Sequence, residues 1–314
     1  MVKNTIVKIQ EVPKKKSWKN YKLIYLMLLP VVLWYVLFCY LPMVGGISLS
    51  FREYRFDMGI WKSPFVGLEH FQKMFRDKDF LVAVRNTIII SLGRIVFQMP
   101  CAILVAVFLN EIRKTGIKRI VQTVITFPHF ISWVVMAGIL TGLFGSSGAI
   151  NGILNSLGMD SISPISQAST FRPFIWLSNI WKEVGWDSII YLAAITSIDP
   201  GLYEAAEMDG ANRLQRIWYV MLPGIRSTIA IMLILAVGQV MTNGSFDQIF
   251  NLYSAPVYKV GDTLDTYIFR ESFISGGLNY GYSSAIGLFK SVIGVIMITV
   301  SNKIVTKLGE NGLF

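Results

Sequence analysis

The sequence predicts an all-α integral membrane protein with six transmembrane helices and one folded loop between two of them. Three observations support this fold class. Hydrophobic residues make up 53% of the 314 residues, and the mean hydropathy is +0.53. Charged residues account for only 15%, against about 25% in soluble proteins. Several apolar stretches also reach the length of about 20 residues that a helix needs to cross a bilayer.

Six such stretches occur along the chain, and each predicts one spanning helix. The first follows a basic segment, but it is full length and lacks a small-residue cleavage site, so we expect it to stay as a helix. The fourth is the least apolar, because four polar or charged residues interrupt it. The predicted spans are residues 23–43, 87–109, 120–144, 174–195, 222–242 and 282–302.

Basic residues predict the orientation, because short cytoplasmic loops are enriched in lysine and arginine. The N-terminal segment, residues 1–22, carries seven basic residues, and the loop at 110–119 carries four. The C-terminal tail at 303–314 adds two lysines. We therefore expect both termini and the loop at 199–221 to face the cytoplasm.

The net charge of +10 indicates a membrane-surface partner. Basic side chains near a bilayer are attracted to anionic lipid headgroups. The long first outer loop, residues 44–86, is an exception to the orientation rule with seven basic residues, although long loops weigh less in that rule. Because basic residues then lie on both sides of the membrane domain at 23–302, nucleic acid is not an expected partner.

Catalytic and metal-binding chemistry is not expected. The chain has two histidines without metal-ligand spacing, and its two cysteines, Cys39 and Cys101, both lie inside apolar stretches, where we expect small buried hydrophobes. It has no phosphate-binding loop of the G-x-x-x-x-G-K type, so we do not expect it to bind or hydrolyse ATP by itself. We predict no catalytic residue, no metal and no cofactor.

The loop at 199–221 is expected to fold and to dock on another protein. Its Asp-Pro pair at 199–200 is typical of a helix start, since aspartate caps free N–H groups and proline fits the first turn. Its Asp-Gly pair at 209–210 is the expected stop, since glycine adopts the left-handed conformation. Small alanines would give the short helix a nearly flat surface that fits a partner's groove. The expected docking residues are Glu204, Ala205, Ala206, Asp209 and Gly210.

Polar and aromatic residues recur at helical spacing inside three predicted spans. Each polar side chain is costly in hydrocarbon and must face protein or water. Aromatic faces beside hydrogen-bonding groups suit sugars, so we expect a wet internal pathway for a sugar. The alternative is structural, with charges paired between helices and tryptophans in the interfacial belts. The expected pathway residues are His129 and Trp133, then Asn179, Lys182, Glu183 and Trp186, and then Gly238, Thr242 and Ser245.

Two further charges lie inside predicted spans. Arg94 shares a helix face with Gln98 on the second span, and Lys290 lies in the middle of the sixth. The sequence leaves the roles of Arg94 and Lys290 open. The same sixth span carries Gly287 and Gly294 on a small-residue face, which is expected to allow close helix packing.

The loop motif carries a family resemblance. Tyr203-Glu-Ala-Ala-Glu-Met-Asp-Gly210, followed by Val220-Met-Leu-Pro223, resembles the cytoplasmic EAA loop of permease subunits in bacterial binding-protein-dependent ABC importers. The usual isoleucine is Val220 here. The resemblance covers residues 21–314, and Phe65-Val-Gly-Leu-Glu-His-Phe71 looks like the carbohydrate branch. The segments at 262–267 and 281–289 are similar to the oligo- and polysaccharide subgroup, which includes lipo-oligosaccharide and alginate importers.

This resemblance implies the type I ABC importer permease fold in a bacterial cytoplasmic membrane. It also implies an assembly with a second homologous permease subunit, two ATP-binding subunits and an external solute-binding protein that delivers a sugar. The loop at 199–221 would couple the ATPase subunits to the membrane domain, and the sugar site would lie among the three stripes. Side chains differ from those of the maltose-type relative at nearly all the stripe positions, so the particular sugar is not implied.

Two other function classes remain open. In a secondary transporter or channel, the polar stripes would carry ion coupling or conduction without an ATPase partner. An integral membrane enzyme would need outer-loop carboxylates poised for chemistry. Asp57, Asp77 and Asp79 have no supporting acid–base or metal motif, so this class ranks last.

Overall fold

The computed structural model describes residues 21–242, 246–274, 279–310 and 312–313, and its regular structure is helical apart from one isolated bridge between Arg52 and Phe65. The all-α prediction is therefore confirmed. The elements are α1 (Lys22–Tyr35), η2 (Val36–Tyr40), α2 (Leu41–Leu49), α3 (Gly59–Lys62), α4 (Glu69–Arg76), α5 (Lys78–Glu111), α6 (Thr115–Thr126), η3 (Phe127–Phe130), α7 (Trp133–Phe144), α8 (Ala149–Ser156), α9 (Ala168–Thr196), α10 (Pro200–Met208), α11 (Arg213–Arg216), η4 (Ile217–Met221), α12 (Leu222–Gly224), α13 (Arg226–Gly238), α14 (Phe246–Leu252), η5 (Ala255–Val257), α15 (Tyr258–Gly261), α16 (Leu264–Phe269), η6 (Arg270–Ile274) and α17 (Tyr280–Lys307).

Four helical stretches in the described ranges are long and apolar enough to cross a membrane, and a bent pair of helices makes a fifth. The predicted spans 23–43, 87–109 and 282–302 each lie inside one of these continuous stretches. α9 covers the predicted fourth span and has 29 residues, but its charged side chains leave it less apolar than the others. The four stretches are Lys22–Leu49, Lys78–Glu111, Trp133–Ser156 and Tyr280–Lys307.

The predicted third span, residues 120–144, is wrong as one continuous helix. Pro128 lies in a 3-10 turn that follows α6, and it has no N–H group to continue the helical ladder. Ser132 then caps the start of α7 by accepting a hydrogen bond from a backbone N–H group in the first turn. The apolar stretch that is long enough to span therefore begins later, at Trp133–Ser156.

The predicted fifth span, residues 222–242, is bent by 59° between α12 and α13. Pro223 and Gly224 precede the bend, and both residue types are common at helix kinks. Gly224 also lies close to Ile198, because a Cβ atom on this glycine would be 2.6 Å from that side chain. The helix after the bend ends at Gly238, four residues short of the predicted end.

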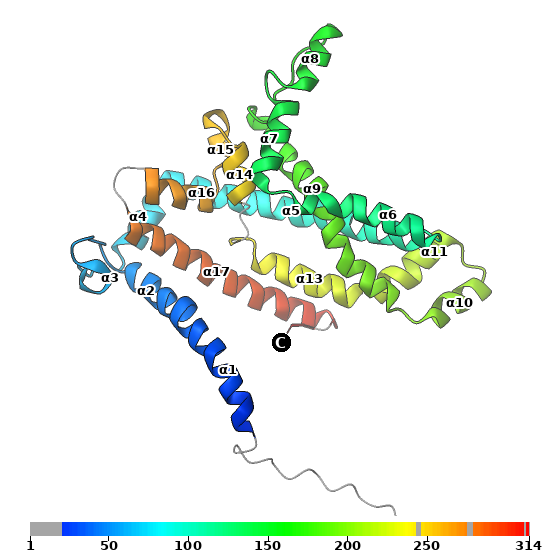
Figure 1. Ribbon diagram of the computed structural model, residues 1–314, viewed down its shortest axis with the longest axis horizontal. Helices are drawn as coiled ribbons and strands as arrows, with labels where there is room; N and C mark the ends of the chain where they lie inside the picture. The colour runs from blue at the N-terminus through cyan, green and yellow to red at the C-terminus, as the bar shows by residue number, and fades with distance from the viewer. Residues whose placement is uncertain (1–20, 243–245, 275–278, 311, 314) are drawn as a thin grey trace, which may run out of the picture.

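Two helix pairs form the centre of the bundle (Figure 1). α5 packs along α9, with Ala102 and Ala106 of α5 in one apolar core with Tyr191 and Ile195 of α9. α13 packs along α17. Residues of α5, α9 and α13, together with shorter elements, surround the cavity described below.

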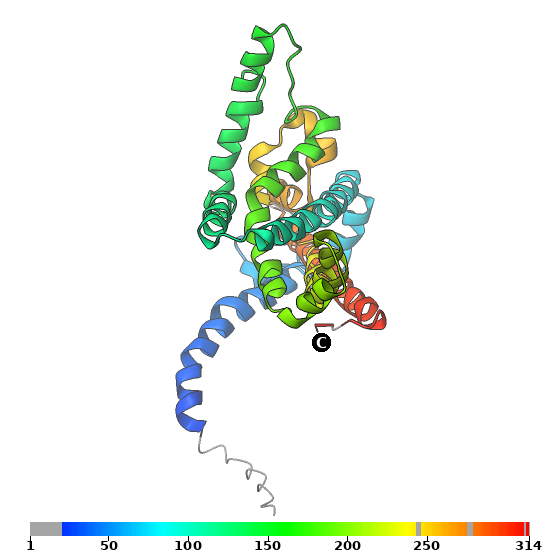
Figure 2. The same ribbon diagram turned by 90° about the vertical axis from the view of Figure 1, so that its right-hand side faces the viewer.

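The ends of the chain and two arms lie outside this centre. α1 stands away from the bundle in both views and has no buried residue, whereas α7 and α8 project from another side (Figures 1 and 2). α17 continues to Lys307, past the predicted start of the tail at residue 303. The chain then folds back, and Glu310 pairs with Arg226 at 2.7 Å at the start of α13. The N-terminal segment at 1–20 lies outside the described residues.

Two glycines let α9 and its neighbours approach closely. A Cβ atom on Gly185 in α9 would lie 2.1 Å from the carbonyl oxygen of Ile125 in α6. A Cβ atom on Gly93 in α5 would lie 2.2 Å from the indole ring of Trp176 in α9. Small residues at such positions allow helices in a membrane to pack backbone against backbone. α9 is therefore held against both α6 and α5.

Candidate functional site

A cavity of about 730 Å³ lies between α5, α9 and α13, and residues of α7, α14 and α16 complete its wall. Four of the predicted pathway residues line it: Trp133, Asn179, Glu183 and Thr242. They come from α7, from α9 and from the turn after α13, which are distant in sequence. The wall thus offers an aromatic face together with hydrogen-bonding groups.

A cluster of three polar side chains joins α9 to the turn before α7. Glu183 accepts hydrogen bonds from Lys182 at 2.8 Å and from the Nδ1 atom of His129 at 2.5 Å. The Lys182 ammonium group also donates to the backbone carbonyl of His129 at 2.8 Å and lies 5.4 Å from the ring centre of Trp133. The adjacent charges on α9 therefore pair with each other, and each has a second partner on the neighbouring segment.

A ladder of amide and carboxyl groups crosses the cavity wall from α9 to α5 and back. The amide nitrogen of Asn179 donates to the amide oxygen of Gln98, and the amide nitrogen of Gln98 donates to the carboxylate of Asp187. Gln98 and Asp187 both line the cavity. Buried polar groups inside a membrane bundle need such partners, because hydrocarbon offers none.

The remaining predicted pathway residues lie away from the cavity wall or outside the described residues. The rings of His129 and Trp186 stack at 4.3 Å, and Trp186 is exposed on the bundle surface. Gly238 faces α17, where a Cβ atom would lie 3.0 Å from Ile298. Lys182 is buried behind the wall. Ser245 falls outside the residues that the structure describes.

The two intramembrane charges without an assigned role both bind side chains from the segment after α13. Arg94 donates to the amide oxygen of Gln248, which is fully buried in α14. Lys290 of α17 pairs with Asp265 of α16. Sequence analysis missed Gln248 and Asp265, because they belong to short helices in what looked like an outer loop.

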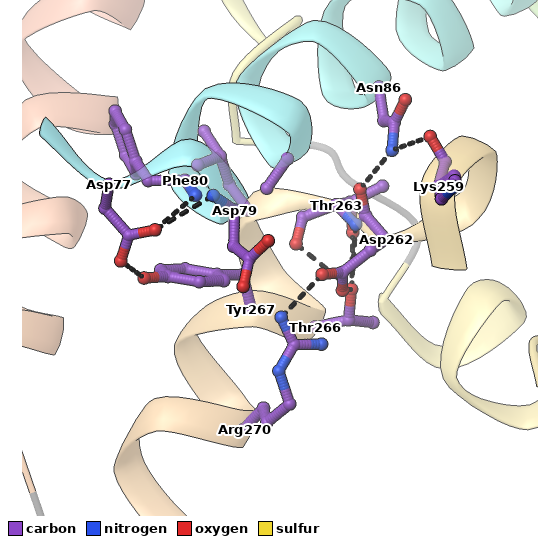
Figure 3. A network of polar contacts seen from close by, with 12 residues as sticks. Asp77, Asp79, Phe80, Asn86, Lys259, Asp262, Thr263, Thr266, Tyr267 and Arg270 are labelled. Atoms are coloured by element: carbon purple, nitrogen blue, oxygen red, sulfur yellow. Dashed lines mark hydrogen bonds and ion pairs between the residues drawn. The ribbon is translucent and has the colours of Figure 1, made fainter. Parts of the chain in front are cut away.

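Buried polar side chains hold the segment at 255–270, which we call the cap segment, against the beginning of α5 (Figure 3). The amide nitrogen of Asn86 donates to the carbonyl oxygens of Asp262 at 2.9 Å and of Lys259 at 3.3 Å. Arg270 pairs with the carboxylate of Asp262 at 2.7 Å. These contacts fix α15 and α16 next to the cavity, so Asp265 stays in its wall.

The cap segment has a second anchor just before α5. The hydroxyl of Tyr267 donates to the carboxylate of Asp77 at 2.6 Å (Figure 3). Partial burial raises the pKa of Asp77, but hydrogen bonds from Tyr267 and from the backbone N–H groups of Asp79 and Phe80 outweigh it and hold this pKa below its ordinary value. Asp77 therefore anchors the cap segment to the start of α5.

The loop helix α10 lies outside the central bundle, at the same end as the turn between α5 and α6 (Figure 1). Asp199 caps it by accepting from the N–H group of Gly201 at 2.9 Å, and Gly210 ends it with a φ of +79°. The predicted helix start at Asp199 and the predicted helix stop at Gly210 are therefore both present. Glu204, Ala205, Asp209 and Gly210 are exposed, and Ala206 is half-buried.

Apolar helices long enough to cross a membrane, packed around a polar cavity, are typical of a multi-pass membrane transport protein. The chain belongs to the family of binding-protein-dependent transport system inner membrane components, which matches residues 98–308. The predicted membrane location and family resemblance are therefore confirmed.

The chain is similar to named permeases over nearly its whole length. It is 40% identical to the protein LplB of Bacillus subtilis (strain 168), over 98% of this chain and 100% of that protein. It is 39% identical to the polygalacturonan/rhamnogalacturonan transport system permease protein YteP of the same organism, over 93% of this chain and 90% of that protein. It also superposes on a chain of the crystal structure of a bacterial alginate ABC transporter in complex with alginate pentasaccharide-bound periplasmic protein. The TM-score is 0.84 and the sequence identity is 37%, and the match covers 94% of this chain and 99% of that chain. The chain therefore shares the fold of an ABC importer permease.

Proposed function

We propose that this chain is one permease subunit of an ATP-driven importer that moves an oligosaccharide or polysaccharide through its central cavity. The cavity itself carries the proposal, because Trp133 provides a stacking face and Asn179, Gln98 and Thr242 provide hydrogen-bonding groups for hydroxyls. The names of YteP and of the alginate transporter support a saccharide as cargo.

The partners follow from surfaces that this chain leaves open. α1 is exposed along its whole length, so lipid and a second homologous permease subunit would cover it. Glu204 and Ala205 are exposed on α10, and one of two ATP-binding subunits would dock on this exposed side. An external solute-binding protein would deliver the saccharide at the opposite face of the membrane.

The mechanism needs two states with different docking geometry. ATP binding would draw the docked α10 helices of the two permeases together and tip the helical bundles from inward- to outward-facing. The saccharide would enter the cavity from the binding protein, and hydrolysis would reverse the motion. ATP shifts this equilibrium only if the docked surface around α10 binds the ATPase differently in the two states.

Uptake by the reconstituted importer tests this function. Proteoliposomes with both permeases, the ATPase subunits and the binding protein should accumulate labelled oligosaccharide only when ATP is inside. Vesicles without the ATPase subunits should show no uptake, whatever ion gradient is imposed. Uptake that follows an ion gradient without ATP would instead establish a secondary transporter.

Orientation has its own test. Cysteine at Ser166, which is exposed between α8 and α9, should react with a membrane-impermeant maleimide in intact cells. Cysteine at Ser17 in the basic N-terminal segment should react only after the cells are opened, because positive charge is retained in the cytoplasm. The opposite labelling pattern would place α10 outside the cell and remove its proposed docking role.

The two tryptophans beside the Lys182 cluster should differ in their effect on transport. Trp133 lines the cavity, so Trp133→Ala should raise the KM for saccharide about tenfold, since an aromatic stack contributes about 1–1.5 kcal/mol. Trp186 stacks on His129 outside the wall, so Trp186→Ala should leave KM within about twofold of the wild type. Trp133→Phe is the conservative control. An equal change in KM for Trp133→Ala and Trp186→Ala would contradict the assignment of the stacking face to Trp133.

A further inference from the structure

Among the described residues that line the cavity, Arg94 is the one basic side chain. It lies in the middle of α5, and its guanidinium forms no ion pair within the described ranges. Its Nε atom is buried and has no hydrogen-bond partner among the residues that the structure describes. A buried cation inside a membrane domain is costly, and it marks a functional site when no side chain neutralises it.

Arg172 of α9 shows what a structural arginine does in the same bundle. Its Nε atom donates to the carbonyl oxygen of Val260 at 3.1 Å, and its Nη2 atom donates to the amide oxygen of Asn86 at 2.8 Å. Arg172 does not line the cavity. Arg94 also donates to a side-chain amide oxygen, but its Nε atom has no second acceptor in the described part of the chain. Arg94 therefore keeps donor capacity at the cavity wall.

A buried amide fixes the position of the Arg94 guanidinium. Gln248 of α14 is fully buried, and its amide nitrogen donates to the carbonyl oxygen of Ile175 at 2.8 Å and to the hydroxyl oxygen of Ser178 at 2.9 Å. Ser178 can accept, because its own proton goes to the carbonyl oxygen of Phe174 at 2.8 Å. Both amide protons of Gln248 are thus engaged, so its amide oxygen is the atom that accepts from Arg94.

The remaining N–H groups of Arg94 determine which chemical group could bind there. A guanidinium has several N–H donors in one plane and no acceptor, and it keeps its proton in proteins. Asn179 and Gln98, two amide side chains of the same wall, already donate to other side chains. A matching group must offer a pair of acceptor oxygens, and on a saccharide this pair is a carboxylate or two vicinal hydroxyls.

We infer that Arg94 binds the saccharide in the cavity through a pair of acceptor oxygens on one sugar, and that Gln248 is its positioning residue. The inference rests on the proposed saccharide import and names the residue of this chain that holds the cargo. Gln248 does not line the cavity, so it acts on the saccharide only through the guanidinium that it holds.

Equilibrium dialysis with two probes tests the role of Arg94. The probes are labelled trigalacturonate and the neutral trisaccharide obtained by reducing its three carboxyl groups, and the sample is the importer purified without its solute-binding protein. Arg94→Met keeps a long side chain and removes the donors, so it should weaken the binding of at least one probe about tenfold or more. A loss confined to trigalacturonate identifies a carboxylate as the acceptor pair, and a loss that includes the neutral probe identifies hydroxyls.

Arg94→Lys keeps the buried cation and provides the measurement if Arg94→Met does not fold. It should weaken binding severalfold, because lysine lacks the planar pair of donors. Binding of both probes at wild-type strength by either Arg94 variant overturns the inference and leaves saccharide import standing. If the wild type binds neither probe, the saccharide cargo itself is wrong, and the inference fails with it.

Arg226→Met is the matched control. Arg226 lies at the start of α13, where its mostly exposed side chain pairs with Glu310 at 2.7 Å, and it does not line the cavity. The same substitution there should leave both dissociation constants within about twofold of the wild type, since exposed ion pairs contribute little. An effect as large as that of Arg94→Met would assign the loss to a general disturbance of the bundle and contradict the inference.

A double-mutant cycle tests the positioning step. Gln248→Met should weaken binding severalfold by itself, because the guanidinium loses its acceptor. In the Arg94→Met background the same substitution should weaken binding no further, since two residues that act through one contact are not additive. A purely structural role of Gln248 would weaken binding by the same factor in both backgrounds, and that result would remove Gln248 as the positioning residue.

Discussion

Gly210→Val is expected to reduce ATP-driven uptake by about tenfold or more while the permease stays inserted in the membrane. Gly210 ends α10 with a φ of +79°, in the left-handed region that glycine adopts freely. A β-branched residue is strained there by about 1–2 kcal/mol, which corresponds to about tenfold in a docking equilibrium. Nothing lies within 4 Å of the added Cβ atom, so the effect acts through the backbone and leaves the bundle core intact.

Asparagine is the matched control at this position. It tolerates the left-handed conformation better than valine, so Gly210→Asn should retain most of the uptake. The measurements are ATP-driven uptake, the amount of ATPase subunit that co-purifies with the permease, and the amount of inserted permease. Normal uptake and full ATPase retention in Gly210→Val would remove α10 from the coupling mechanism.

A bulky side chain on the same helix should act by a different route. Ala205 is exposed on α10, so Ala205→Trp would hold an ATPase surface away without straining the permease itself. We expect this variant to lose the ATPase subunits on purification, whereas Ala205→Ser should keep them. Retention of the subunits by the tryptophan variant would show that this face of α10 is not the docked one.

The loop helix could be predicted from sequence because its signals are local. A cap at Asp199 and a stop at Gly210 depend only on neighbouring backbone groups, and the structure has both. The breaks in two predicted spans involve local residues as well, at Pro128 and at Pro223-Gly224. Hydropathy over a window of about 20 residues averages across such residues, so it predicted continuous helices where the chain turns.

The cavity wall could be predicted only in part, because it combines side chains from distant segments. Trp133, Asn179 and Glu183 were found from their spacing on single helices. Asp265 was missed, because only the tertiary fold brings the short helix α16 against α5. Gly238 has the right spacing for the stripe but faces α17, since periodicity identifies a helix face and not the neighbour that covers it.

Gly185→Ala is expected to be among the most destabilising single-methyl changes in the bundle. The new Cβ atom would lie 2.1 Å from the carbonyl oxygen of Ile125 and 2.7 Å from the backbone nitrogen of Thr126. Backbone atoms cannot rotate away as a side chain can, so α9 and α6 would have to separate. Overpacking of this kind costs about 1–3 kcal/mol or more. Lys182 and Glu183 lie within one turn of the contact, so the cluster with His129 would be disturbed as well.

Three other glycines provide a graded comparison. Gly138→Ala and Gly287→Ala introduce the same methyl group into α7 and α17, where nothing lies within 4 Å, and should leave the melting temperature nearly unchanged. Gly93→Ala should fall between, because the ring of Trp176 can rotate away if it gives up its hydrogen bond of 3.0 Å to the carbonyl of Ile90. Thermal unfolding of each purified importer, with uptake as a second readout, gives the order. If Gly185→Ala melts at the same temperature as Gly138→Ala, α9 does not touch α6 through its backbone. This contact holds α9 in register with the turn that carries His129. Without it, the placement of Glu183 in the cavity wall would lose its support.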